Sequence, residues 1–288
     1  REYVIVDNGS SDNTREVVEE FAAKVSAPVH YVFEEKAGHS FALNSGCRKA
    51  SGGRLVFTDD DTLPDKFWLQ EIDKSFRTHN ADWVFGPIVP KWEHGDQPWW
   101  YGERTAAFIA CLDFGDLALE GDRLDSSFFG ANHACSRDKI FELGLYDEEL
   151  GLRGDGLSYS GNDIDLYQKA REVGMKVIYL PLMRVQHIIA KDRYLPSKHR
   201  RAFWKTGRNE CLAYLREYEQ RGEYVRFPRF RFPKLAIALL QFGYSAIRLN
   251  RADFFYWQVQ VIRHWSFIWM SLRAFSSRAF TSWQGKDV

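Results

Sequence analysis

Hydrophobic positions in the first ninety residues alternate between short continuous runs and helical stripes. Apolar runs typical of buried strands lie at residues 3–7, 29–33, 54–58 and 82–90. Stripes with helical spacing lie between and after them, at residues 12–26, 39–50 and 64–78, the last opened by Pro64. These repeated strand–helix–strand units predict an α/β fold with a central, mostly parallel sheet and helices on both faces.

After residue 90 the pattern of the sequence changes twice. Residues 91–160 are irregular and rich in Trp, Gly and Asp, as in long functional loops. A helix is expected over 161–174 and a strand over 176–181, and helical patterns dominate from about residue 197. We therefore predict two domains, an α/β domain at residues 1–195 and a mainly helical extension at residues 196–288.

Charge is distributed unevenly along the chain. The 288 residues carry a net charge of zero, but residues 191–288 hold 19 Lys and Arg against 7 Asp and Glu. The first part is correspondingly acidic, which suits a cation, whereas the basic and aromatic end suits an anionic surface. Hydrophobic residues make up 45% of the chain, which is enough to build a buried core and excludes a disordered chain.

Several functional classes are disfavoured. The four cysteines are widely spaced without a C-x-x-C pair, which argues against a zinc knuckle or a disulfide framework and favours a cytoplasmic setting. Nucleic acid is not an expected partner, because the basic end lacks a stacking-platform or groove-reading motif. The longest uncharged apolar stretch near the end, Leu235 to Ile247, has thirteen residues and is too short to span a bilayer.

The basic and aromatic segment 226–280 leaves two interpretations open. One is a helix on an anionic membrane leaflet, with Arg at the headgroups and aromatic rings below them. The other is a set of helices packed on the first domain or on a second copy of the chain. Peripheral membrane contact and an oligomer are both compatible with the sequence.

The stretch RLVFTDDDTLPDKFWL, residues 54–69, places three adjacent carboxylates after a predicted strand. A solvated turn or helix cap is one interpretation. A calcium loop of the EF-hand type fails, because Pro64 and Gln70 fall where the glycine and the bidentate Glu are needed. The third interpretation is a D-x-D pair, Asp59 and Asp61, that holds Mg²⁺ or Mn²⁺ against a diphosphate.

Four segments, in order, resemble the family 2 glycosyltransferases. They are YVIVDNGSSDNT (3–14), the stretch from EEKAGHSFALNSG to the three aspartates (34–69), GANHACSRDKIFELGLYDEEL (130–150) and GNDIDLYQKAREVGMKVIYLPLMRVQH (161–187). The resemblance covers about residues 1–195. It implies the GT-A fold, a nucleotide-sugar donor and Mn²⁺ or Mg²⁺ as cofactor.

The resemblance implies a donor site near the ends of the first strands. Asp7 corresponds to the residue that accepts a hydrogen bond from a nucleobase imide, which indicates a UDP- or dTDP-sugar. A simple turn before Asn8 is the alternative for this residue. The other donor-binding residues implied are Lys36, Gly38, Asn44, Asp59 and Asp60.

Metal and acceptor residues follow from the same resemblance. Asp61 and His187 correspond to the metal ligands, although a lone His is more often structural. The floor where sugar and acceptor meet corresponds to Gly130, Ala131 and Asn132. Asn162 stands where the family usually has Glu, which leaves the acceptor-side contacts open.

Asp163 corresponds to the catalytic general base. It would remove the proton from the acceptor hydroxyl as that oxygen attacks the anomeric carbon opposite the leaving group, so that one displacement inverts the centre. An N-cap of the helix that begins near residue 161 is the alternative role. Specificity for sugar and acceptor is expected from the Trp-rich loop 91–129.

We therefore expect a metal-dependent inverting glycosyltransferase that acts on a glycan or lipid-linked acceptor in surface polysaccharide synthesis, at the cytosolic face of a membrane. A sugar nucleotidyltransferase is one alternative, against which Asn162, Asp163 and His187 favour sugar transfer. A catalytically silent sugar- or nucleotide-binding module is the other, against which Asp61 and Asp163 are both present. The chain starts at Arg1 without methionine and without the family's usual first strand. We expect the natural protein to be longer.

Overall fold

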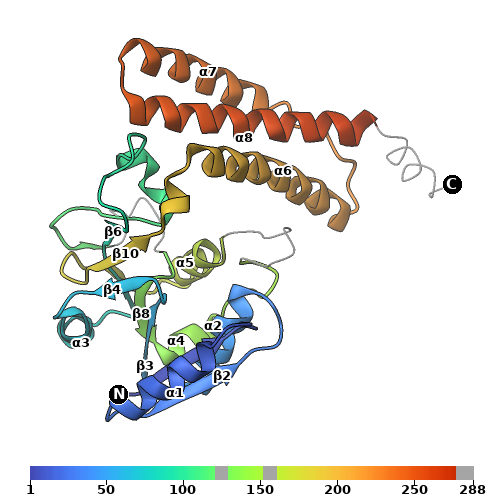
Figure 1. Ribbon diagram of the computed structural model, residues 1–288. Helices are drawn as coiled ribbons and strands as arrows, with labels where there is room; N and C mark the ends of the chain where they lie inside the picture. The colour runs from blue at the N-terminus through green and yellow to red at the C-terminus, as the bar shows by residue number, and fades with distance from the viewer. Residues whose placement is uncertain (121–128, 152–160, 277–288) are drawn as a thin grey trace. The chain divides into compact units, whose positions relative to one another are not determined.

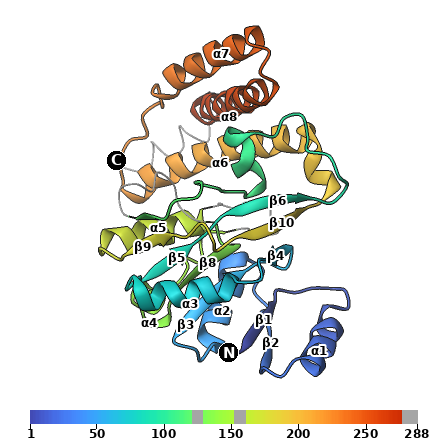
Figure 2. The same cartoon turned by 90° about the vertical axis from the view of Figure 1, so that its left-hand side faces the viewer.

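The computed structural model describes residues 1–120, 129–151 and 161–276, and its elements are shown in Figures 1 and 2. Contacts divide the chain into two compact units. Unit 1 comprises Arg1–Lys91 and Ala110–Ile188, and unit 2 comprises Trp92–Ile109 and Ile189–Val288. Part of the predicted specificity loop, 121–128, and residues 152–160 lie outside the described residues. The predicted division into domains at residue 195 stays a prediction.

Unit 1 begins with a two-stranded parallel sheet. Its elements are β1 (Tyr3–Asp7), α1 (Thr14–Lys24), β2 (Val29–Phe33) and the following helix α2 (His39–Lys49). The predicted strands at 3–7 and 29–33 are confirmed. Asp7 pairs in register with Phe33, so the ends of both strands and the loops that follow them meet.

A five-stranded mixed sheet forms the centre of unit 1. In spatial order its strands are β3 (Arg54–Thr58), β8 (Asn132–Ser136), β5 (Trp83–Phe85), β9 (Val177–Tyr179) and β7 (Leu119–Glu120). β8 runs antiparallel to both of its neighbours, β5 and β9 are parallel, and β7 is antiparallel to β9. The α/β class is confirmed, but the sheet is mixed rather than mostly parallel. Strand periodicity indicates which residues form a strand and does not fix the direction in which it runs.

A second sheet, of three strands, corrects the predicted start of the helix at Pro64. Its strands, in order, are β4 (Thr62–Pro64), β10 (Val185–Ile189) and β6 (Ile88–Trp92). Pro64 lies in β4 opposite Val185 and does not open a helix; α3 (Trp68–Thr78) begins four residues later. A proline is tolerated in β4 because this strand lies at the edge of its sheet.

Gly86 divides the predicted strand 82–90 into β5 and β6. A Cβ atom at this position would lie 2.0 Å from the carbonyl oxygen of Met183, so only glycine fits where these two backbones cross. The chain changes sheets at this crossing. The described part of unit 1 contains two further helices, α4 (Arg137–Glu142) and α5 (Asn162–Glu172), and α5 confirms the helix predicted over 161–174.

His133 lies in the buried core beneath the sheet. Its ring stacks on Phe57 at 4.4 Å and on Trp83 at 5.4 Å between centroids. The Trp83 Nε1–H group donates to His133 Nδ1 at 3.2 Å, which leaves Nε2 as the protonated nitrogen facing the Tyr146 hydroxyl at 3.0 Å. Burial lowers the pKa of His133 to about 3, so the ring is neutral.

Unit 2 is helical. Its elements are the short helices Glu103–Ile109 (η1) and Lys191–Tyr194 (η3), and the long helices α6 (Pro196–Gln220), α7 (Arg231–Ile247) and α8 (Arg251–Ser276). α8 contacts both α6 and α7. Glu210 on α6 forms ion pairs with Arg231 on α7 and Arg263 on α8, which joins the three long helices. Within the described residues, every helix is too short or too polar to cross a bilayer.

We expect Tyr146→Phe to lower the free energy of unfolding of unit 1 by about 1–3 kcal/mol, because it removes the buried hydrogen bond between His133 Nε2 and the Tyr146 hydroxyl. Urea denaturation measures this change. Tyr224→Phe is the matched control, since Tyr224 is 76% exposed and should show no loss. Equal stability of the two variants would contradict a stabilising role for this hydrogen bond.

Candidate active site

The acidic turn 59–61 follows directly from the end of β3. The hydroxyl of Thr62 donates to the Asp59 carbonyl at 2.8 Å and lies 2.6 Å from the hydroxyl of Thr58, which closes the turn. Asp59 and Asp61 are half-buried and Asp60 is exposed. The D-x-D pair therefore turns toward the protein, while the middle carboxylate faces solvent.

Asp61 and His187 meet across two neighbouring strands. Thr62 pairs with His187 in the antiparallel β4–β10 ladder, and the Ile188 N–H group donates to the Asp61 carbonyl at 2.8 Å. This register brings Asp61 Oδ2 to 3.1 Å from His187 Nε2. The imidazole is 4% exposed and the carboxylate is 39% exposed, so the pair is reached from the carboxylate side.

This pair fits a divalent cation in part. One carboxylate oxygen and one imidazole nitrogen suit Mn²⁺ better than Mg²⁺, which prefers oxygen ligands. The described residues contain no group of three or more His, Cys, Asp or Glu side chains arranged to hold a metal. The donor set therefore fits a cation whose remaining ligands are phosphate oxygens and water.

In the β3–β8 pairing, Thr58 lies opposite Asn132. The residues before β8 therefore lie beside the acidic turn 59–61 that follows β3. Asn132 is fully buried. Its amide donates to the carbonyls of Pro87 at 2.9 Å and Met183 at 2.7 Å, and its oxygen accepts from Trp68 Nε1 at 2.8 Å. All these hydrogen bonds are internal, so the side chain braces the strand crossing. Ala131 is also buried.

Asp163 lies against the backbone of Gly130. The Gly130 N–H group donates to Asp163 Oδ2 at 3.0 Å, and a Cβ atom at residue 130 would lie 3.2 Å from Oδ1. The N-cap of α5 is Gly161, so the alternative role of Asp163 as an N-cap is excluded. Asp163 occupies the first turn of the helix, with its carboxylate directed to the loop that precedes β8.

The environment of Asp163 favours its protonated form. Burial raises its pKa to about 6, and the charge of Asp59 acts in the same direction, while the Gly130 hydrogen bond and His39 oppose the rise. Oδ1 is shielded from solvent and has no hydrogen-bond partner among the described residues. A carboxylate with a pKa near neutrality can accept a proton at physiological pH, which is the property of a general base.

Asp7 lies at the end of β1, in a shallow hollow of about 360 Å³. Its oxygens accept hydrogen bonds from the Tyr31 hydroxyl at 2.6 Å and the Ser10 N–H group at 2.8 Å, and these bonds hold the pKa of Asp7 below its usual value. The carboxylate is thus ionised and retains lone pairs for a further donor. The Ser10 bond also makes Asp7 a turn residue, so both roles that the sequence allows are compatible with its geometry.

Asn8 organises the neighbouring loop, and the sequence pattern showed it only as a turn residue. Its amide donates to the carbonyls of Glu34 at 2.9 Å and Lys36 at 2.7 Å, and its oxygen accepts from the Gly38 N–H group at 2.8 Å. Gly38 has φ 148°, which favours glycine. Lys36 is exposed.

Two further residues lie near this loop. The resemblance implied Asn44 as a donor-binding residue, whereas His39 was not predicted. Asn44 is buried, and its amide exchanges hydrogen bonds with the backbone of Tyr146 at 2.9 and 3.0 Å. Its side chain therefore joins α2 to residue 146. His39, which follows Gly38, lies with Nδ1 3.4 Å from Asn162 Nδ2 and links the loop to the start of α5.

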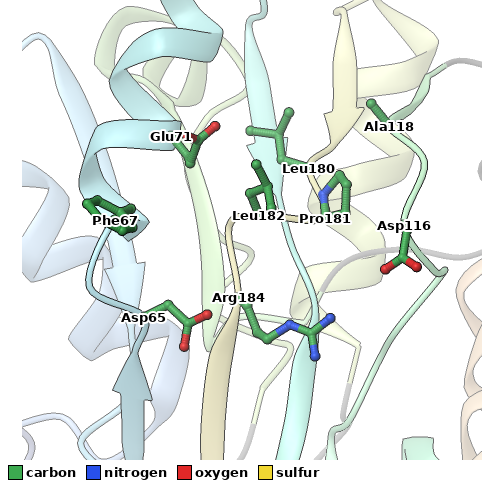
Figure 3. Close-up of a pocket in the computed structure, with 9 residues that line it drawn as sticks. All are labelled: Asp65, Phe67, Glu71, Asp116, Ala118, Leu180, Pro181, Leu182 and Arg184. Atoms are coloured by element: carbon green, nitrogen blue, oxygen red, sulfur yellow. The ribbon is translucent and has the colours of Figure 1, made fainter.

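The structure thus gathers two groups of predicted residues in unit 1. Asp59, Asp61, Gly130, Asp163 and His187 lie where β3, β8, β10 and α5 meet, and Asp7, Lys36 and Gly38 surround Asn8. A separate hollow of about 530 Å³, shown in Figure 3, lies at the opposite end of β4 and β10 from Asp61 and His187. Its lining residues are Asp65, Phe67, Glu71, Asp116, Ala118, Leu180, Pro181, Leu182 and Arg184. None of the individually predicted site residues lines it, but Asp116 and Ala118 belong to the predicted specificity loop 91–129.

Comparisons with known proteins agree on one family. Residues 1–140 match the profile of Glycosyl transferase family 2. A glucosyl-dolichyl phosphate glucuronosyltransferase of Haloferax volcanii is 24% identical over 195 residues, which are 67% of this chain and 60% of that protein. A validoxylamine A glucosyltransferase of Streptomyces hygroscopicus subsp. jinggangensis is 36% identical over 190 residues, covering 57% of this chain and 42% of that protein.

A solved mannosyltransferase from Pyrobaculum calidifontis, in complex with GDP-Man and Mn²⁺, covers 97% of this chain and 66% of its own, at 16% identity and a TM-score of 0.49. The chain spans less than two thirds of the length of the two curated relatives. Unit 1 is a mixed α/β unit, and the GT-A arrangement that the resemblance implies stays a prediction. The match over residues 1–140, together with these relatives, supports a family 2 glycosyltransferase.

Proposed function

We propose that the protein is a metal-dependent inverting glycosyltransferase that moves a sugar from a UDP- or dTDP-sugar to a glycan or lipid-linked acceptor. The observation that carries this proposal is the Asp163 carboxylate. It is held by the Gly130 N–H group at 3.0 Å, has a pKa of about 6, and lies near the acidic turn that precedes β4. Few structural roles require a buried carboxylate with this pKa.

Asp163 acts as the general base. Its free oxygen accepts the proton of the acceptor hydroxyl while that oxygen forms a bond to the anomeric carbon, and the bond from this carbon to the diphosphate oxygen breaks. The electron pair leaves with the nucleoside diphosphate, and the anomeric centre is inverted. Gly130 holds the carboxylate in place, and its lack of a Cβ leaves room for that carboxylate.

Asp61 and His187 would hold the divalent cation, Mn²⁺ or Mg²⁺. When bound, the cation offsets negative charge on the leaving diphosphate. His187 is held by the β4–β10 register and Asp61 by the turn that Thr62 closes, so the two donors are oriented by backbone hydrogen bonds. Asp59 and Asp60 extend along the ribose and the sugar.

Asp7 selects the base. Its ionised carboxylate accepts a hydrogen bond from the imide N–H group of uracil or thymine, a ring N–H group that cytosine and adenine lack. Lys36 and Gly38 line the nucleotide pocket on the loop that Asn8 holds. Asn44 and Asn132 act through the backbones that they hold, because their own hydrogen bonds are internal.

The acceptor class is proposed from the relatives. One of them is named a glucosyl-dolichyl phosphate glucuronosyltransferase, which supports a lipid-linked acceptor and synthesis at a membrane surface. Asn162, beside His39 at the start of α5, contributes the acceptor-side contact together with Gly130 and Ala131. The sugar is selected by the loop at residues 91–129.

We expect Asp163→Asn to lower turnover by about 10²–10⁴-fold, because it removes the proton acceptor and retains the side-chain shape. UDP release from a UDP-sugar measures turnover, and calorimetry should show unchanged UDP affinity. Asp165→Asn is the matched control, since Asp165 lies on the same helix and pairs with Lys169 at 2.7 Å. Wild-type turnover in Asp163→Asn would contradict the role of Asp163 as the base, whereas no UDP release by the unaltered protein would favour a nucleotidyltransferase or a silent binding module.

The rate should depend on pH through Asp163. The base is active when deprotonated and its pKa is about 6, so kcat/KM should rise tenfold per pH unit below about pH 6 and level off above it. A pH–rate profile between about pH 4.5 and 8 measures this step. The residual rate of Asp163→Asn should lack the step. A wild-type midpoint near that of an ordinary Asp would contradict the role of burial.

We expect UDP to bind only when Mn²⁺ is present, and Asp61→Ala to lose affinity by at least about tenfold, because a cation ligand is removed. Calorimetric titration of UDP with and without Mn²⁺ measures both effects. Asp65→Ala, at the other end of β4, serves as control. If UDP, dTDP and GDP all fail to bind with metal present, the transferase proposal is wrong and the aspartates form a solvated turn.

A further inference from the structure

Helix α7 in unit 2 contacts α8 and also carries an exposed apolar face. Its buried positions are Ala238 and Ser245. Away from them, Leu240 is 74% exposed and Ile247 is 82% exposed. Ile237, Leu240, Tyr244 and Ile247 are spaced by three, four and three residues, so these exposed side chains form one continuous stripe.

The stripe is surrounded by positive charge. Residues 224–252 contain six Lys or Arg and no Asp or Glu. One of the six, Arg231, is mostly buried and pairs with Glu210 at 2.6 Å, which anchors α7. The other five are exposed, and within the described part of the chain no ion pair joins them to a carboxylate: Arg226, Arg229, Lys234, Arg248 and Arg251.

Both ends of α7 combine a cation with an exposed aromatic ring. At the first end, the Lys234 ammonium lies 5.9 Å from the Phe230 ring. At the other end, the Arg248 guanidinium lies 5.7 Å from the Tyr244 ring and donates to its hydroxyl at 3.0 Å. Aromatic and basic side chains together are typical of the boundary between lipid headgroups and acyl chains.

We propose that the exposed face of α7, defined by Ile237, Leu240, Tyr244 and Ile247, lies in the surface of an anionic lipid leaflet. The apolar stripe enters the acyl boundary, and the flanking cations meet lipid phosphates. Charge complementarity selects this occupant, because a run of 29 residues with cations at both ends and no carboxylate matches a continuous anionic surface. The helix lies in the plane of the membrane, in keeping with the finding that no helix among the described residues is long and apolar enough to cross it.

This proposal depends on unit 2 alone and not on the transfer reaction. Membrane binding is measured without donor or acceptor, so its failure is distinct from failure of the proposed function. If both hold, α7 keeps the enzyme at the surface where lipid-linked acceptors are found.

The test is sedimentation of the full chain with vesicles of phosphatidylcholine, with and without about 30% phosphatidylglycerol, at about 0.15 M salt. The wild type should bind the anionic vesicles and not the neutral ones, and should be released at about 0.5 M salt. The double variant Leu240→Glu, Ile247→Glu should lose at least about tenfold in affinity, because charge replaces the inserted side chains. The triple variant Lys234→Ala, Arg248→Ala, Arg251→Ala should lose about fivefold per removed cation.

Leu182→Glu is the matched control, since Leu182 is 64% exposed on unit 1 and should leave vesicle binding unchanged. Circular dichroism checks that each variant is folded, which is expected because every substituted side chain is exposed. Equal binding to neutral vesicles, or wild-type binding by the Leu240, Ile247 variant, would overturn the proposal. So would a wild-type dimer that ignores vesicles and dissociates in that variant, since a second copy would then cover α7.

Discussion

The antiparallel pairing of β3 with β8 is the constraint on which the candidate site depends. Its register puts Thr58 opposite Asn132, so the acidic turn after β3 and the loop before β8 end at one edge. A slip of one residue would turn each side chain of β8 to the other face of the sheet. Buried Asn132 opposes such a slip, because its amide is bonded at once to Pro87, Met183 and Trp68.

Electrostatics add a second condition to this geometry. Asp163 is buried near the charge of Asp59, and its pKa is raised accordingly. A carboxylate whose pKa is higher in the folded than in the unfolded state costs stability once pH exceeds the unfolded value, because folding then opposes ionisation. Such a cost is expected of a residue retained for chemistry rather than for packing. The same acidic edge gives a cation at Asp61 and His187 a favourable field.

For three asparagines, the role expected from the sequence differs from the contacts that the side chain makes in the structure. The resemblance implies ligand contact for Asn44 and Asn132, yet the hydrogen bonds of both amides are internal. Asn8, which the sequence pattern showed only as a turn residue, holds the loop from Glu34 to Gly38. An amide side chain can serve a ligand or a backbone equally well, because it presents one acceptor and two donors. A sequence motif therefore identifies the residue but does not indicate whether its partner is a ligand or the protein backbone.

The sequence by itself determined the elements with strong periodicity and the order of chemistry along the chain. The runs at 3–7, 29–33 and 54–58 form strands, and the acidic turn follows β3 as expected, because these features depend on neighbouring residues. Only the tertiary structure decided the direction of β8, the break at Gly86, the contact of Asp163 with Gly130 and the exposed face of α7. Each of these features depends on which distant parts of the chain come into contact, and local periodicity carries no information about those contacts.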